Sequence, residues 1–158
     1  MKISFKNGTS ASEGTIRKLE TELGYQLSES FRAFVRKNDG SEPDTNLFRI
    51  SDKIESGVNK FIPVTDIANE RRRIENLPSK AYPVAWAEGG NYVFVDEGSN
   101  GQVFFWDHEE PAKIAKLGDN FDAFLSSLEP FDVKAIEVKP GQVKKAWINP
   151  DLLKRLKK

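Results

Sequence analysis

Residues 82–107 read YPVAWAEGGNYVFVDEGSNGQVFFWD, and this stretch decides the fold. Three short runs rich in valine, tyrosine, phenylalanine and tryptophan are separated by the glycine-containing segments 88–91 and 97–101. Aromatic and β-branched residues favour strands, and the pair Asn100-Gly101 is a strong signal for a hairpin turn. The stretch therefore predicts a three-stranded antiparallel meander over residues 82–107.

Both faces of the predicted meander carry apolar side chains. Successive side chains of a strand point to opposite faces, so Tyr92 and Phe94 share one face while Val93 and Val95 share the other. Residues 103–106 continue the pattern with Val, Phe, Phe and Trp. We therefore expect these strands to be central in a sheet that helices cover on one face and that is partly covered on the other.

Two helices are predicted ahead of the meander. Residues 2–6 alternate in polarity and predict a short edge strand. Ser10 and Glu13 have the capping-box spacing, which predicts a helix start, and Gly24 supplies a left-handed stop. This amphipathic helix is expected to pack on the central sheet. A second helix is expected to begin after Ser28. Its expected buried residues are Phe31, Phe34 and Val35.

Further elements lie on either side of the meander. Residues 47–50 and 61–64 read as strands, and the polar segment 51–60 between them reads as a mobile loop. Thr65 or Asp66 is expected to cap a third helix over residues 67–77.

Beyond the meander, residues 113–117 predict a weak strand, and Asp119 or Asn120 is expected to cap a last helix of the domain. Its expected apolar face consists of Phe121, Phe124, Leu125 and Leu128.

Taken together, these elements predict an α+β fold. A central antiparallel sheet of about five to six strands is flanked by about four helices, all within one domain of residues 1–131. Residues 132–158 differ in composition and are expected to form a basic C-terminal extension, a strand or loop followed by a short helix.

Charge is distributed unevenly, although the formal net charge of the chain is zero. Residues 88–132 carry 2 basic and 10 acidic side chains, whereas residues 133–158 carry 8 basic and 2 acidic ones. An acidic sheet region argues against nucleic acid as its partner and favours a basic protein, with a solvated acidic face as the alternative. The chain lacks cysteine and any apolar run long enough to span a membrane, so we expect a cytoplasmic protein.

No catalytic signature is found. His108 is the only histidine, which rules out a histidine-rich metal site, and no G-x-S-x-G motif presents a nucleophilic serine. Asp96 and Asp107 could act as paired carboxylates, but nothing distinguishes them from structural acids. The arginines at 71–73 would point around a helix, so we interpret them as surface residues, one of them paired with a carboxylate. We expect no enzyme activity, cofactor or metal.

Three motifs occur in order along the chain. The first is Leu19-Glu20-x-x-Leu23-Gly24-x-x-Leu27-x-x-x-Phe31-Arg32-x-Phe34, followed by Asn38-Asp39-Gly40. The second is Gly89-Gly90-Asn91-x-Val93-x-Val95-Asp96. The third is Gly101-x-Val103-Phe104-Phe105-Trp106-Asp107-His108-Glu109, followed by the apolar helix after residue 120.

This order resembles the SUKH superfamily over about residues 12–130, although Leu27-Ser28 stands where relatives often have Leu-Pro. The superfamily includes immunity proteins of bacterial polymorphic toxin systems and yeast regulators of cell-wall synthesis. The resemblance implies an α+β fold with an antiparallel sheet and flanking helices, and it implies no catalytic residues.

The resemblance and the acidic sheet region together predict an immunity protein that binds a cognate nuclease toxin domain one to one. We expect the protein itself to be a monomer or a weak homo-oligomer. A regulatory scaffold is the first alternative, and a small metal-dependent hydrolase using Asp107 and His108 is the second. The predicted partner-binding residues are Asp96, Glu97, Asp107, Glu109 and Glu110.

Overall fold

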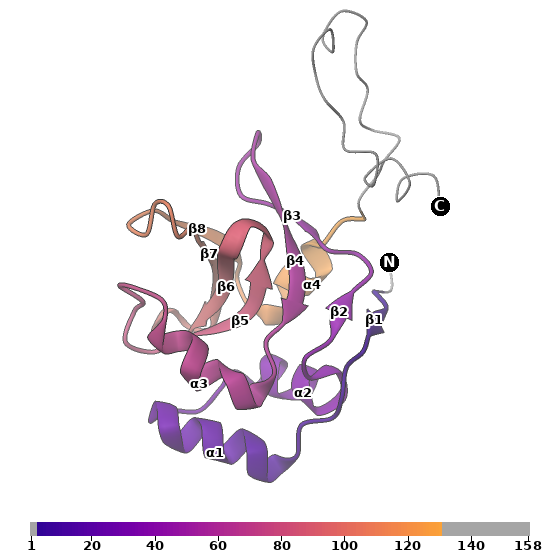
Figure 1. Ribbon diagram of the computed structural model, residues 1–158, viewed down its shortest axis with the longest axis vertical. Coiled ribbons are helices and arrows are strands. Elements are labelled where there is room, and N and C mark those ends of the chain that lie inside the picture. Colours follow the sequence, from indigo (N-terminus) through magenta and orange to yellow (C-terminus); the bar gives the residue numbers. More distant parts are fainter. Residues whose placement is uncertain (1–2, 131–158) are drawn as a thin grey trace, which may run out of the picture.

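The computed structural model describes residues 3–130 and shows a six-stranded antiparallel sheet with helices against it (Figure 1). The strand order is β3-β4-β5-β6-β7-β8, so neighbours in the sheet are neighbours in the chain. The predicted α+β class is therefore confirmed. The strands of this sheet are β3 (Leu47–Arg49), β4 (Glu55–Phe61), β5 (Ala81–Ala87), β6 (Asn91–Asp96), β7 (Gln102–Trp106) and β8 (Ile114–Gly118).

The predicted meander corresponds to β5, β6 and β7. Val93 lies opposite Phe105 in the β6–β7 pair, and Tyr92 lies opposite Trp106. The turn between these strands places Asn100 at φ 59° and Gly101 at φ 78°. A Cβ at Gly101 would lie 2.9 Å from the Ser28 hydroxyl oxygen. The turn therefore needs glycine both for its backbone angle and for its close contact with the start of the second helix.

Four helices are present in the described residues: α1 (Glu13–Leu23), α2 (Glu29–Asn38), α3 (Val64–Arg72) and α4 (Phe121–Ser127). The predicted cap at Ser10 is wrong, because the side chain of Ser12 accepts the hydrogen bond from the Thr15 N–H. Asn120 caps α4 in the same way, as predicted. The prediction for α3 is shifted: Pro63 occupies the cap position, so Val64 begins the helix instead of ending a strand.

Residues 51–60 are not one loop, because β4 begins at Glu55. Ser56, Gly57 and Val58 are buried between β3 and β5 even though two of them are poor strand formers. The predicted N-terminal strand is reduced to β1 (Phe5–Lys6). It pairs with β2 (Glu42–Pro43) in a separate two-stranded sheet.

The hydrophobic core lies between the helices and one face of the sheet. Phe121 of α4 contacts the rings of Phe31, Phe34 and Phe61, with ring centroids between 5.1 and 6.0 Å apart. Helix α1 lies against α3, which lies against β5, so α1 is not packed mainly on the sheet as expected (Figure 1).

The opposite face of the sheet is only partly covered. There Phe94 and Trp106 pack with Ile74 and Leu77 from the segment after α3. Phe104 remains partly exposed on that face. The predicted asymmetry, with helices on one face and partial cover on the other, is confirmed.

The sheet is strongly curled toward the helices. Four strand spacings separate β3 from β7, which in a flat sheet would place them about 19 Å apart. Instead the rings of Phe48 in β3 and Phe105 in β7 lie 5.7 Å apart across the inner face. This curl brings the β3–β4 hairpin toward the β7–β8 hairpin.

Candidate protein-binding site

The five predicted partner-binding carboxylates lie at two opposite ends of the β6–β7 hairpin. Asp96 lies opposite Gln102 at one end, whereas Tyr92 lies opposite Trp106 at the other, next to Asp107. A hairpin of this length separates its ends by about 13 Å. The structure brings Asp107, Glu109 and Glu110 together, but it does not bring Asp96 or Glu97 to them.

Asp96 and Glu97 are used inside the protein. The two carboxylate oxygens of Asp96 accept hydrogen bonds from the Gly98 N–H at 2.9 Å and the Ser99 hydroxyl at 3.0 Å. Glu97 Oε1 accepts hydrogen bonds from the Ser28 N–H at 2.8 Å, the Ser28 hydroxyl at 2.5 Å and the Tyr82 hydroxyl at 2.7 Å. These carboxylates stabilise the β6–β7 turn and its contact with α2.

The Tyr82 hydroxyl remains a donor to Glu97 throughout the physiological range. Tyr82 is fully buried. Burial raises the pKa of Tyr82 well above its usual value, and the neighbouring Glu97 carboxylate raises it further. The tyrosine is therefore neutral whenever it contacts the carboxylate.

The remaining three carboxylates lie on the loop between β7 and β8. Asp107 Oδ1 accepts a hydrogen bond from the Glu109 N–H at 2.9 Å, and the Asp107 carbonyl accepts one from the Glu110 N–H at 3.1 Å. The His108 N–H donates to Asn91 Oδ1 at 3.0 Å and so ties the loop to the start of β6. The loop backbone is held in place, while the side chains of His108, Glu109 and Glu110 are exposed.

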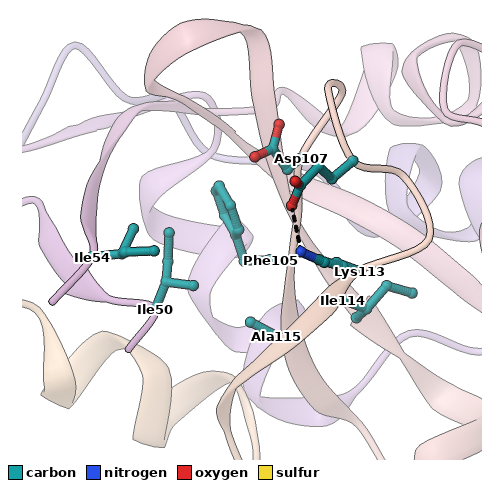
Figure 2. Close-up of a pocket in the computed structure, with 8 residues that line it drawn as sticks. Ile50, Ile54, Phe105, Asp107, Lys113, Ile114 and Ala115 are labelled. Carbon is teal, nitrogen blue, oxygen red and sulfur yellow. Dashed lines mark ion pairs between the residues drawn. The ribbon is translucent and has the colours of Figure 1, made fainter. Parts of the chain in front are cut away.

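An apolar groove lies beside this acidic loop (Figure 2). Its volume is about 260 Å³, and its apolar lining includes Ile50 and Ile54 from the β3–β4 hairpin together with Phe105 from β7 and Ala115 from β8. The curl of the sheet creates the groove, since these hairpins are far apart in the strand order. Asp107, Glu110 and Lys113 add charged groups to its wall, and Lys113 pairs with Glu110 at 3.2 Å.

The two most exposed large apolar residues of the described chain both border this groove. Ile54 is 57% exposed, and Ile114 is 41% exposed. Ile114 lies opposite Trp106, so its side chain is on the far face of the sheet from Ala115. Ile54 is therefore the exposed apolar side chain on the groove side, and an apolar groove with charged groups at its wall is typical of a protein-binding surface. We refer to the groove and the loop 107–113 together as the acidic groove.

Sequence reasoning predicted the loop carboxylates of the acidic groove but missed its apolar wall. Ile50 and Ile54 flank a short polar run, Ser-Asp-Lys, inside the segment that had been interpreted as a loop. The available signal was an isoleucine at each end of a polar turn, because apolar side chains placed this way indicate a hairpin that packs against another part of the protein.

The three consecutive arginines have different partners, and Arg71 is the one that bonds to the segment after α3. Arg71 donates to the carbonyl oxygens of Ala81 at 2.8 Å and Ser79 at 3.0 Å. Arg73 lies 3.5 Å from the buried carboxylate of Glu70. The prediction that one arginine pairs with a carboxylate is confirmed.

Residues 3–130 contain neither a cluster of metal ligands nor a membrane-spanning helix. No three His, Cys, Asp or Glu side chains in this range lie close enough together to hold a metal ion. None of the helices in the same range is long and apolar enough to cross a membrane.

Comparison with known proteins identifies one family. The model of the SMI1 / KNR4 family (SUKH-1) matches residues 10–127, which includes all four helices and the whole six-stranded sheet. Comparison with curated proteins gives no match. The matched region also contains the complete acidic groove.

Proposed function

Because this chain belongs to the SMI1 / KNR4 family (SUKH-1), we propose that it is an immunity protein that neutralises a toxin by binding it. Proteins of the SUKH superfamily act through protein–protein interaction. In this proposal the protein acts in the cytoplasm, forms a one-to-one complex with a cognate nuclease toxin domain and catalyses no reaction of its own.

The acidic groove is the observation that carries the proposal. Glu109 and Glu110 are exposed beside an apolar groove whose lining includes the exposed side chain of Ile54. Apolar anchors surrounded by charged groups supply affinity from the buried centre and specificity from the rim. A partner that fits this surface presents apolar side chains next to lysine or arginine.

A nuclease has the required charge. Its active-site cleft attracts phosphates and is therefore basic, so a surface rich in carboxylates can occupy the same cleft. Residues 107–113 carry three carboxylates and one lysine. Complementary charge of this kind raises association rates by about 10–10³, which suits an inhibitor that must act before the toxin reaches nucleic acid.

The test is co-expression with the product of the adjacent gene, which the proposal expects to be the toxin. We expect the full-length protein to restore growth of cells that express the toxin domain, and to elute with it as a one-to-one complex in size-exclusion chromatography. Growth arrest that persists despite soluble expression of both proteins would refute the proposal.

A regulatory scaffold is the second candidate, and the same family match supports it. A scaffold would also bind proteins through the acidic groove, but its partner would be a protein of the same cell whose loss changes growth without any toxin present. Deletion of this gene in cells that carry no toxin gene separates the two: the immunity proposal predicts normal growth.

A further inference from the structure

Strand β8 has an open outer edge. It is the last strand of the six-stranded sheet, and β7 is the one strand paired with it in residues 3–130. The opposite edge of the sheet is covered at Leu47 of β3, which exchanges two backbone hydrogen bonds with Glu129, at 2.9 and 2.8 Å. An open edge presents a row of backbone donors and acceptors to which an extended chain can bond.

The open part of this edge borders the acidic groove. Ala115 contributes to the groove from β8, and Ile50 and Ile54 form the facing wall. Helix α4 packs on the face of β8 near the end of the strand, since a Cβ at Gly118 would lie 3.1 Å from the Phe124 nitrogen. The stretch from Ile114 to Lys116 lies ahead of this contact and next to the groove, so it is the part of the edge with which an added strand would pair.

The charges around β8 favour a basic occupant. The lysines on either side of the open stretch are already paired: Lys113 with Glu110 at 3.2 Å, and Lys116 with Asp119 at 2.5 Å. The hydrogen bond from Lys116 also lowers the pKa of Asp119 below its usual value. Asp107 and Glu109 have no such ion pair within residues 3–130, so their charge is available to an incoming lysine or arginine.

We propose that the partner protein binds by adding an extended segment to β8 as a seventh strand. Side chains of a strand alternate between faces. Every second side chain of the segment therefore enters the groove against Ile54 and Phe105 and is aliphatic. A lysine or arginine of the segment lies against Asp107 and Glu109. Backbone hydrogen bonds supply affinity and the groove supplies specificity. This inference rests on the proposed function, because it assigns the binding mode of that same partner surface.

A random dodecapeptide library displayed on phage and selected on the full-length protein tests the binding mode. We expect enriched peptides with Val, Ile or Leu at every second position and with at least one Lys or Arg. In an added strand, alternate N–H groups point toward β8 and away from it. N-methylation at every second residue of a selected peptide therefore removes either the N–H groups that face β8 or those that face away. We expect one alternate set to weaken binding at least tenfold per methyl group, and the other set to change it less than twofold.

Two variants of the protein serve as a matched pair in this assay. Asp107→Lys is expected to weaken binding of the selected peptides at least tenfold, whereas Asp66→Lys, at an exposed position of α3, is expected to leave it unchanged. Three outcomes overturn the inference. They are equal loss of binding for both sets of N-methylated positions, equal effects of the two variants, and a library that yields no binder. A fourth is a dimer in sedimentation equilibrium that the peptides dissociate, since β8 would then pair with a second copy.

Failure of this inference and failure of the proposed function give different results. If the function is wrong, the toxin domain does not bind at all. If only the binding mode is wrong, the toxin domain binds and is neutralised, while the peptide selection shows no alternation.

Discussion

Replacing Asp107, Glu109 and Glu110 together by lysine is expected to abolish protection against the toxin domain. The change places three positive charges where a basic partner approaches, and like charges brought together at an interface cost several kcal/mol. Every 1.4 kcal/mol corresponds to about a tenfold change in affinity. We therefore expect the dissociation constant, measured by isothermal titration calorimetry, to rise by at least 100-fold. We also expect the association rate constant to fall, and to fall most at low salt.

The folded protein should tolerate these three substitutions. Glu109 and Glu110 are exposed, and the ion pair lost between Glu110 and Lys113 is a surface pair of little energetic value. Replacing Asp107 also removes the acceptor of the Glu109 N–H, but this donor lies in an exposed loop where water can replace the carboxylate. A control variant with Glu22, Asp66 and Glu75 replaced by lysine has the same net charge, and all three of its positions are exposed on or next to α1 and α3. We expect this control to bind within a factor of three of the parent protein. Equal loss in both variants would mean that total charge matters, and that the acidic groove does not.

Replacing Glu97 by alanine is expected to lower the free energy of unfolding by about 3 kcal/mol. Glu97 Oε1 accepts hydrogen bonds from both the N–H and the hydroxyl of Ser28 and from the buried Tyr82 hydroxyl, so the truncation leaves donors without their acceptor. For a protein of this size the melting temperature should fall by roughly 6–12 °C. Urea unfolding followed by tryptophan fluorescence measures the change directly.

Glu109→Ala is the matched control for Glu97→Ala. It removes the same carboxylate from an exposed position of the β7–β8 loop, so the free energy of unfolding should change by less than about 0.5 kcal/mol. The two variants are expected to have the opposite effects on affinity for the toxin domain: Glu109→Ala weakens the complex, and Glu97→Ala leaves the affinity of the folded protein unchanged. Similar unfolding energies for the two variants would contradict the division into a structural and a partner-binding carboxylate.

The meander could be predicted because local signals determine it. Runs of Val, Tyr, Phe and Trp separated by Glu88–Gly90 and by the Asn100-Gly101 turn are sufficient to place three strands. The helices α1 and α2 followed from their apolar spacing and from Gly24, which has φ 87° at the end of α1. In each case the information lies within a few residues of the element itself.

The acidic groove could be predicted only in part, because it depends on contacts between distant segments. The five carboxylates fall at strand ends and turns of the meander within one acidic stretch, which suggested one acidic surface, but strand pairing places Asp107 at the opposite end of the hairpin from Asp96. The wall formed by Ile50 and Ile54 reaches the loop through the curl of the sheet. That curl depends on how Phe48 and Phe105 pack, and the spacing of apolar residues along the chain carries no information about it.

Strand β4 shows the same limitation at a smaller scale. Ser56 and Gly57 are poor strand formers, so residues 51–60 lack an alternating pattern. They are extended because β3 and β5 supply backbone partners on both sides. Tertiary pairing therefore overrides local preference in this segment.

Amide hydrogen exchange of the full-length protein, alone and in complex with the toxin domain, is the most direct test of the acidic groove as the partner-binding surface. The account predicts that new protection concentrates in residues 107–116 and in the hairpin 50–54, with residues 13–23 of α1 unchanged. Protection concentrated on α1 and α3, or around the β6–β7 turn at residues 96–101, with the acidic groove still exchanging freely, would contradict it.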